Sequence, residues 1–173
     1  MTSRPAPAAR RGAARERSVP AWLPKVALAI CVLGVLVSAY LTYDAFSAST
    51  TLACPEGETL NCAKVTDSQW SKLFGIPVAP LGLLFFVGMG WLCRPVLFRR
   101  PGLRWDRLRL AAVSIGLAMV LYLVWAELFK IHAICLWCTV VHVLTFLLFI
   151  ALVFGQIMIE PAPERVRYKD RTR

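Results

Sequence analysis

Charged residues are scarce in this sequence. They make up 17% of its 173 residues, against about 25% in an average soluble domain, and hydrophobic residues make up 58%. No internal repeat is visible, and a chain of this length that crosses a membrane several times has no room for a second folded domain. The composition therefore predicts an integral membrane protein of one domain and excludes an ordinary soluble enzyme.

The charge that is present is mostly positive and unevenly placed. The net charge is +10, yet no aromatic-interleaved basic face or known nucleic-acid module accompanies it, so we expect no nucleic-acid partner. The Lys and Arg residues gather in the N-terminal segment, in the connection at 94–109 and in the C-terminal segment. Because cytoplasmic segments carry the excess of Lys and Arg, both termini are predicted to lie in the cytoplasm.

Four apolar runs are long enough to cross a lipid bilayer. They predict an all-α bundle of four transmembrane helices within residues 22–159, with helices at about 22–46, 75–97, 108–129 and 132–158. Glu127 and Lys130, near the end of the third helix, are expected to reach toward the membrane surface with their charged groups. Residues 1–21 and 160–173 are predicted to be disordered cytoplasmic tails.

The connection at 47–74 is the one sizeable segment expected outside the membrane, on its outer face. The spacing of apolar residues in its second half predicts a short amphipathic helix that lies on the membrane surface.

Four of the six cysteines fall on the predicted outer face, where disulfides persist. Cys135 and Cys138 form a C-x-x-C at the start of the fourth predicted helix, where unsatisfied N–H groups and the helix dipole favour a thiolate. Cys54 and Cys62 frame a segment with Pro, Gly and Asn that can turn tightly enough to close a disulfide.

The other two cysteines, Cys31 and Cys93, are predicted near the inner ends of the first two helices. We interpret both as small buried hydrophobic residues.

The outer cysteines have alternative interpretations. A C-x-x-C is half of many zinc sites, but a partner half with suitable spacing is missing, so we predict no metal. Cys54 and Cys62 alone are typical of a structural disulfide, whereas two dithiol pairs on one face can pass electrons by successive exchange. A membrane scaffold or metal handler with structural cysteines is the non-enzymatic alternative.

A relay that begins in water and ends at the membrane suggests a lipid-soluble quinone as its acceptor. His142 lies four residues after Cys138, on the same face of the predicted helix, where it can hydrogen-bond a quinone oxygen or supply a proton. The alternative is a histidine that is hydrogen-bonded across helices for packing. Trp137 and Phe85, together with Cys138, are predicted as further quinone contacts.

Several spaced motifs resemble the vitamin K epoxide reductase family over about residues 26–159. They are Cys54 and Cys62, eight residues apart, then Ser68-Gln69-Trp70-Ser71-Lys72-Leu73-Phe74-Gly75, which is similar to the family's S-x-W-x-x-x-F-G, then Gly82 and the C-x-x-C. The resemblance implies a four-helix bundle around a quinone of menaquinone, vitamin K or ubiquinone type. It also implies that Cys138 attacks the quinone, that Cys135 exchanges with Cys62, and that Cys54 meets the external thiol donor.

In bacterial members of that family the donor is a thioredoxin-fold oxidase of secreted proteins, so the resemblance implies such a partner and a bacterial cytoplasmic membrane. Two departures from animal members bear on the substrate. The asparagine that binds the quinone there is absent from residues 75–80, and a tyrosine after the C-x-x-C is replaced by His142. We therefore predict a thiol:quinone oxidoreductase, with reduction of vitamin K epoxide as the alternative activity.

Overall fold

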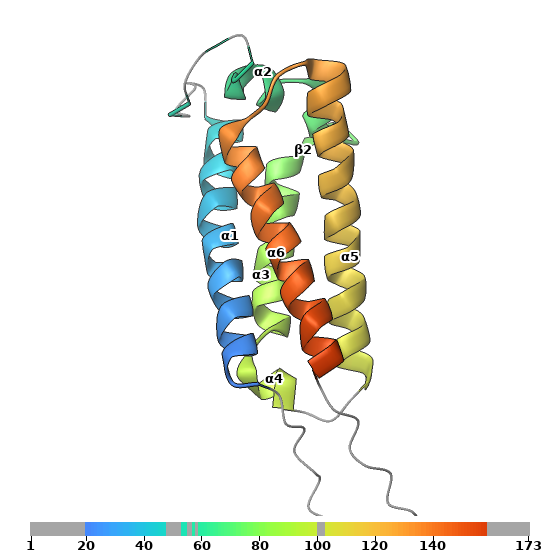
Figure 1. Cartoon of the computed structure of the whole chain (residues 1–173). Coiled ribbons are helices and arrows are strands. Elements are labelled where there is room, and N and C mark those ends of the chain that lie inside the picture. Colours follow the sequence, from blue (N-terminus) through green and yellow to red (C-terminus); the bar gives the residue numbers. More distant parts are fainter. Residues whose placement is uncertain (1–19, 48–52, 55–56, 58, 100–102, 159–173) are drawn as a thin grey trace, which may run out of the picture.

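The computed structural model describes residues 20–47, 53–54, 57, 59–99 and 103–158 (Figure 1). Most of these residues are helical, as the sequence predicts. The predicted tails, residues 1–21 and 160–173, lie outside the described residues except for Pro20 and Ala21.

Four helices run along the length of the bundle: α1 (Trp22–Phe46), α3 (Val78–Leu92), α5 (Leu103–Ala126) and α6 (Leu136–Met158). Three stretches are long and apolar enough to cross a membrane, namely Trp22–Phe46, Arg104–Ile131 and Leu136–Ile157. The fourth helix, α3, is apolar but has 15 residues. The exposed side chains of these helices are largely Leu, Val, Ile and Phe, as contact with lipid requires. The chain is therefore a mainly helical integral membrane protein.

Small residues let the helices approach closely. The helix α1 packs against α3 and α6, and α5 packs against α6 and α3. A Cβ added at Gly34 of α1 would collide with Phe86 of α3, and one at Gly155 of α6 would collide with Leu23 of α1. Apolar burial drives helix association weakly in lipid, so this close van der Waals packing holds the bundle together.

The two ends of the bundle differ. One end carries α4 (Pro95–Arg99), the start of α1 and the end of α6, and the opposite end carries α2 (Cys62–Thr66) and β2 (Ile76–Pro77) (Figure 1). Near the α4 end, Arg109 and Asp106 form a buried ion pair of 2.8 Å. Arg109 Nε also donates to the Leu92 carbonyl oxygen at 2.8 Å, and the guanidinium lies 3.9 Å from the centre of the Phe98 ring. These contacts tie α5 to α3 and α4.

Helix α1 has its predicted bounds, but the other helices differ. The predicted start of α3 at residue 75 is wrong, because Gly75 lies in a turn with a φ of 82°. The predicted end at 97 is also wrong, because the helix stops at Leu92 and Pro95 opens the separate helix α4. The third helix, predicted at about 108–129, begins earlier, because α5 starts at Leu103, and its helical backbone continues to Ile131 through the π-helical turn η2 (Glu127–Ile131). The start of α6 lies after residue 132, because His132 has a left-handed φ of 52°.

The connection between α1 and α3 holds several short elements where one surface helix was predicted. They are α2 (Cys62–Thr66), the 3-10 turn η1 (Gln69–Ser71), and the antiparallel strands β1 (Lys72–Leu73) and β2 (Ile76–Pro77). The apolar spacing that suggested a helix therefore belongs to two helical turns followed by a hairpin. Two short strands thus accompany the predicted all-α bundle.

Candidate functional site

The connection between α1 and α3 is docked onto the segment that precedes α6. Leu60 and Ile134 form an isolated parallel β-bridge. The N–H of Ile134 donates to the Thr59 carbonyl oxygen at 2.8 Å, and the N–H of Asn61 donates to the Ile134 carbonyl oxygen at 3.2 Å. Cys62 lies two residues after Leu60, and Cys135 directly follows Ile134. The two backbone hydrogen bonds therefore bring these distant parts of the chain together.

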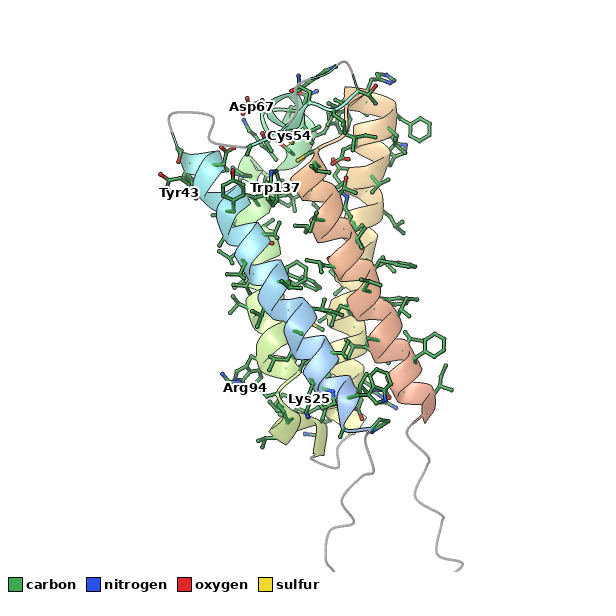
Figure 2. All side chains as sticks on the ribbon, turned by 60° about the vertical axis from the view of Figure 1, so that its left-hand side comes forward. Lys25, Tyr43, Cys54, Asp67, Arg94 and Trp137 are labelled. Carbon is green, nitrogen blue, oxygen red and sulfur yellow. A yellow bond between two sulfur atoms is a disulfide. The ribbon has the colours of Figure 1, made fainter. Side chains whose placement is uncertain are left out.

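All four predicted redox cysteines lie in one cluster at this end of the bundle. Cys62 and Cys135 belong to its buried part, and Cys54 and Cys138 pack against them. Figure 2 shows Cys54 at the same end as Trp137. Cys54 and Cys62 are joined by a disulfide, whereas Cys135 and Cys138 are free thiols. The fold thus brings together the two pairs that the sequence singled out.

The C-x-x-C lies at the boundary between the loop and α6. Cys135 immediately precedes the helix, and the backbone N–H of Cys138 donates to Cys135 Sγ at 3.3 Å. A hydrogen bond from the Cys138 side chain lowers the pKa of the Cys135 thiol from its ordinary value, and the backbone N–H adds to this effect against the opposing effect of burial. The structure therefore favours Cys135 as the thiolate and Cys138 as its thiol partner.

Short polar side chains shape the loop above the bundle. Asn61 Oδ1 accepts a hydrogen bond from the Lys64 N–H at 2.9 Å and so caps α2. Ser68 Oγ accepts from the Ser71 N–H at 3.3 Å and caps η1. The S-x-W motif thereby positions Trp70 and Ser71 over the bundle, where both line a cavity.

That cavity, of about 250 Å³, lies between α1, α3, α5 and α6. Its walls are mainly apolar, and the polar side chains among them include those of Ser38, Thr66, Ser71, Glu127, Cys138, His142 and Thr145. Phe85, Cys138 and His142, three of the predicted quinone contacts, all line it. Cys138 therefore borders both the cysteine cluster and the cavity.

Trp137, the fourth predicted quinone contact, does not line this cavity. Its Nε1 donates to the Ala53 carbonyl oxygen at 3.1 Å, and its ring packs edge-on against Tyr40 with 5.1 Å between ring centres. The Tyr40 hydroxyl in turn accepts from the Ala53 N–H at 3.1 Å. Ala53 precedes Cys54, so these contacts hold the chain beside the disulfide. A quinone contact of Trp137 stays a prediction.

Ser38 of α1 is a cavity residue that sequence reasoning missed. It is 1% exposed, and its Oγ has no hydrogen-bond partner among the residues that the structure describes. Most helical Ser and Thr hydroxyls can bond a carbonyl one turn earlier, as Thr42 does with the Ser38 carbonyl oxygen at 2.6 Å. A single serine in an apolar run is a weak sequence signal for that reason.

Glu127 does not reach the membrane surface, so that prediction is wrong. It is 5% exposed and lines the cavity. Its carboxyl group interacts electrostatically with the backbone N–H of Cys135. Lys130 is exposed, and its Nζ lies 5.5 Å from the centre of the Trp70 ring and 5.3 Å from that of Trp125.

Cys31 and Cys93 lie in the hydrophobic core formed by the α4 half of the bundle. Both are buried, as interpreted from the sequence, and they belong to a different cluster from the four other cysteines. Among the described residues, no group of three or more His, Cys, Asp and Glu side chains is placed to hold a metal ion.

Membrane-length apolar helices and two clustered cysteine pairs define this chain as a membrane-embedded thiol-redox protein. The model of the Vitamin K epoxide reductase family matches residues 25–153, so the chain belongs to that family. Membership confirms the resemblance carried by the cysteines and the S-x-W motif. It also makes the protein an oxidoreductase of a family that acts with quinones.

Proposed function

We propose that the protein is a membrane thiol:quinone oxidoreductase that passes electrons from a reduced thioredoxin-fold partner to a quinone and so supports disulfide formation. The position of the C-x-x-C carries this proposal. Cys135 lies in the buried cluster beside the loop disulfide, whereas Cys138 also lines the apolar cavity. Electrons that arrive at the loop can therefore reach the cavity by thiol–disulfide exchange alone.

The cavity suits the head group of a quinone, because it has apolar walls with a few convergent polar groups. Ser38, His142 and Phe85 line the cavity, so Ser38 Oγ and the His142 imidazole would hydrogen-bond quinone oxygens and Phe85 would supply an aromatic wall. A bound quinone would accept two electrons and two protons. No asparagine is present among the described lining residues, which supports a quinone over an epoxide as the acceptor.

A second groove, of about 410 Å³, supports an approach from the lipid. It lies between α5 and α6 and shares Val120, Glu127 and His142 with the cavity. Its other lining residues are almost all apolar. We assign this groove to the hydrophobic tail of the quinone.

We place the cysteine cluster on the outer side of a bacterial cytoplasmic membrane, with both termini in the cytoplasm. Most of the 20 Lys and Arg residues lie in the terminal segments and around α4, and Figure 2 shows Lys25 and Arg94 at the end opposite Cys54. Such an excess of basic residues marks the cytoplasmic side. We assign α3, about 22 Å long at 1.5 Å per residue, as the fourth span, continued by the hairpin before it.

The observed state of the cysteines is one stage of the proposed relay. With Cys54 joined to Cys62, and with Cys135 and Cys138 reduced, the two electrons of a turnover reside on the C-x-x-C. Their transfer to the acceptor joins Cys135 to Cys138 and releases the thiol protons. Cys54 is half-buried whereas Cys62 is 2% exposed, which supports Cys54 as the cysteine that meets the partner.

Reduction of the loop pair by the partner then restores the C-x-x-C. The Cys62 thiolate attacks Cys135 and the Cys135–Cys138 bond breaks, with Cys138 leaving as a thiolate. Cys54 next attacks Cys62, which closes the loop disulfide and releases Cys135. Each step exchanges one S–S bond for another, and the lowered pKa of Cys135 makes it a good leaving group.

The direct test mixes the purified protein with a reduced thioredoxin-fold partner and a menaquinone or ubiquinone analogue, and follows quinol absorbance. Cys138→Ala should abolish quinol formation, whereas Cys31→Ala, in the other core cluster, should retain it. An undiminished rate for Cys138→Ala would refute the mechanism. A parallel reaction with vitamin K epoxide tests the alternative activity, epoxide reduction. Epoxide turnover without quinone turnover would contradict the proposal.

A further inference from the structure

Glu127 is an ionisable residue that the relay described so far does not use. It opens η2 at the end of a membrane-length apolar stretch and is 5% exposed. Carboxyl groups are costly in such surroundings, and those that persist there usually belong to a functional site. The contacts of Glu127 indicate which site.

The carboxyl group of Glu127 lies against the C-x-x-C. It interacts electrostatically with the backbone N–H of Cys135 and lines the same cavity as Cys138. It also interacts electrostatically with the side chains of both Cys135 and Cys138. Its backbone carbonyl accepts from the N–H of Ala133 at 3.3 Å, which fixes the segment between η2 and α6.

Glu127 also borders the space in which the acceptor would bind. With His142 it lines both the cavity and the groove between α5 and α6. A single carboxyl group therefore lies between the thiols that lose protons and the cavity in which protons are consumed. Water is scarce in an apolar cavity, so the proton of a thiol that borders the cavity needs a fixed group to carry it.

We propose that Glu127 is the proton carrier of the Cys135/Cys138 pair, an inference that rests on the proposed function. As the Cys135–Cys138 bond forms and two electrons leave, the Glu127 carboxylate takes the Cys138 thiol proton and passes it to an oxygen of the reduced acceptor. The second proton, which Cys135 gave up on ionising, is drawn from water. The step balances: one disulfide forms, two electrons leave the two cysteines, and two protons reach the acceptor.

Other ionisable groups surround Glu127, and all of them except His142 differ from it in position. On α6 and before it they are Cys135, Cys138 and His142, and on α5 the nearest in sequence is Tyr122. The helix α2, which packs against η2, carries Lys64, which is exposed, and Cys62, which is in the disulfide. On its own segment Lys130 and His132 are exposed. Of all these, only Glu127 and His142 line both the cavity and the groove.

The test compares Glu127→Gln with the wild type. Glutamine keeps the size of the side chain and a polar oxygen, but it cannot carry a proton. Quinol formation should slow by about 100-fold, as for the loss of a general acid–base group, with the KM for the quinone analogue unchanged. Asp67→Asn, an exposed change at the same end of the bundle, should leave the rate unaltered.

Two further readouts separate proton transfer from a structural role. In Glu127→Ala, added formate should restore part of the rate, because a small acid can replace the missing carboxyl. In protein without quinone, the ultraviolet titration of the Cys135 thiolate should move to lower pH in Glu127→Gln, because the carboxylate raises the pKa of Cys135.

The outcomes are distinct. A wild-type protein that forms no quinol would refute the proposed function. Normal quinol formation by Glu127→Gln would overturn the proton-carrier inference alone. A slow variant that formate does not rescue, and whose Cys135 titration is unchanged, would also overturn it, because the carboxyl would then serve only to hold α6 in place.

Discussion

Ser38→Ala should change protein stability and quinone binding in opposite directions. In the structure the Ser38 hydroxyl is fully buried, lines the cavity and has no hydrogen-bond partner among the described residues. An unsatisfied buried hydroxyl costs about 1–3 kcal/mol. Replacing it with a methyl-sized side chain removes that cost, and alanine is also the better helix former. The variant should therefore be as stable as the wild type or more stable by up to about 3 kcal/mol.

The effect on binding follows from the same atom. If Ser38 Oγ donates to a quinone oxygen, Ser38→Ala loses one hydrogen bond, with a net contribution of about 0.5–1.5 kcal/mol. At 1.4 kcal/mol per factor of ten, the dissociation constant should rise by about 2- to 12-fold. The cavity shape changes little, because only the hydroxyl oxygen is removed.

The assay titrates a quinone analogue into the detergent-solubilised protein and follows quenching of tryptophan fluorescence, and thermal unfolding is measured on the same samples. Thr42→Val is the matched control. Its hydroxyl lies one turn further along α1, bonds its own helix and does not line the cavity. Unchanged binding in Ser38→Ala, or lower stability with weaker binding, would show that the hydroxyl serves packing and not the ligand.

Two further predictions concern the bundle and the relay. Gly34→Ala should destabilise the protein by about 1–3 kcal/mol, because the added Cβ meets the buried Phe86 ring; Gly88→Ala, with open space around its Cβ position, is the control in thermal unfolding. Cys62→Ser mixed with the oxidised partner should accumulate a mixed disulfide between Cys54 and the partner, visible by non-reducing electrophoresis. The Cys54 thiolate breaks the S–S bond of the partner, and the Cys62 thiol that would resolve the new bond is gone. No trapped species with an active wild type would show that the partner exchanges with another cysteine.

The membrane fold was predictable because it depends on composition and on run length. The helix α1 is built around one uncharged run, residues 26–43, and similar runs located the other helices. The helix ends were less predictable, since they depend on local backbone geometry. The left-handed His132 and the turn at Gly75 leave little trace in hydrophobicity, and they moved the starts of α6 and α3.

The candidate site was predictable in its cysteines and not in its cavity walls. The thiol is itself the reactive group, so the C-x-x-C and the second cysteine pair can be recognised from residue type and spacing alone. The presence of Ser38 and Glu127 in the cavity wall depends on which way each side chain faces, and this is set by helix packing. Trp137 is the opposite case. Its neighbours in sequence suggested a contact with the quinone, but its indole N–H donates a hydrogen bond to the loop.

The position of the C-x-x-C at the start of α6 is what joins the two phases in which the proposed reaction takes place. The cysteine outside the helix belongs to a loop that is held by the Leu60–Ile134 bridge, so exchange with Cys62 is intramolecular and avoids the entropic cost of an encounter. The cysteine three residues later lies in the first helical turn and borders the apolar cavity. The same motif placed one turn deeper in α6 would no longer contact the loop. A motif placed entirely in the loop would no longer border the cavity. In the proposed reaction, a dithiol at the start of a helix would therefore couple thiols in water to an acceptor in lipid.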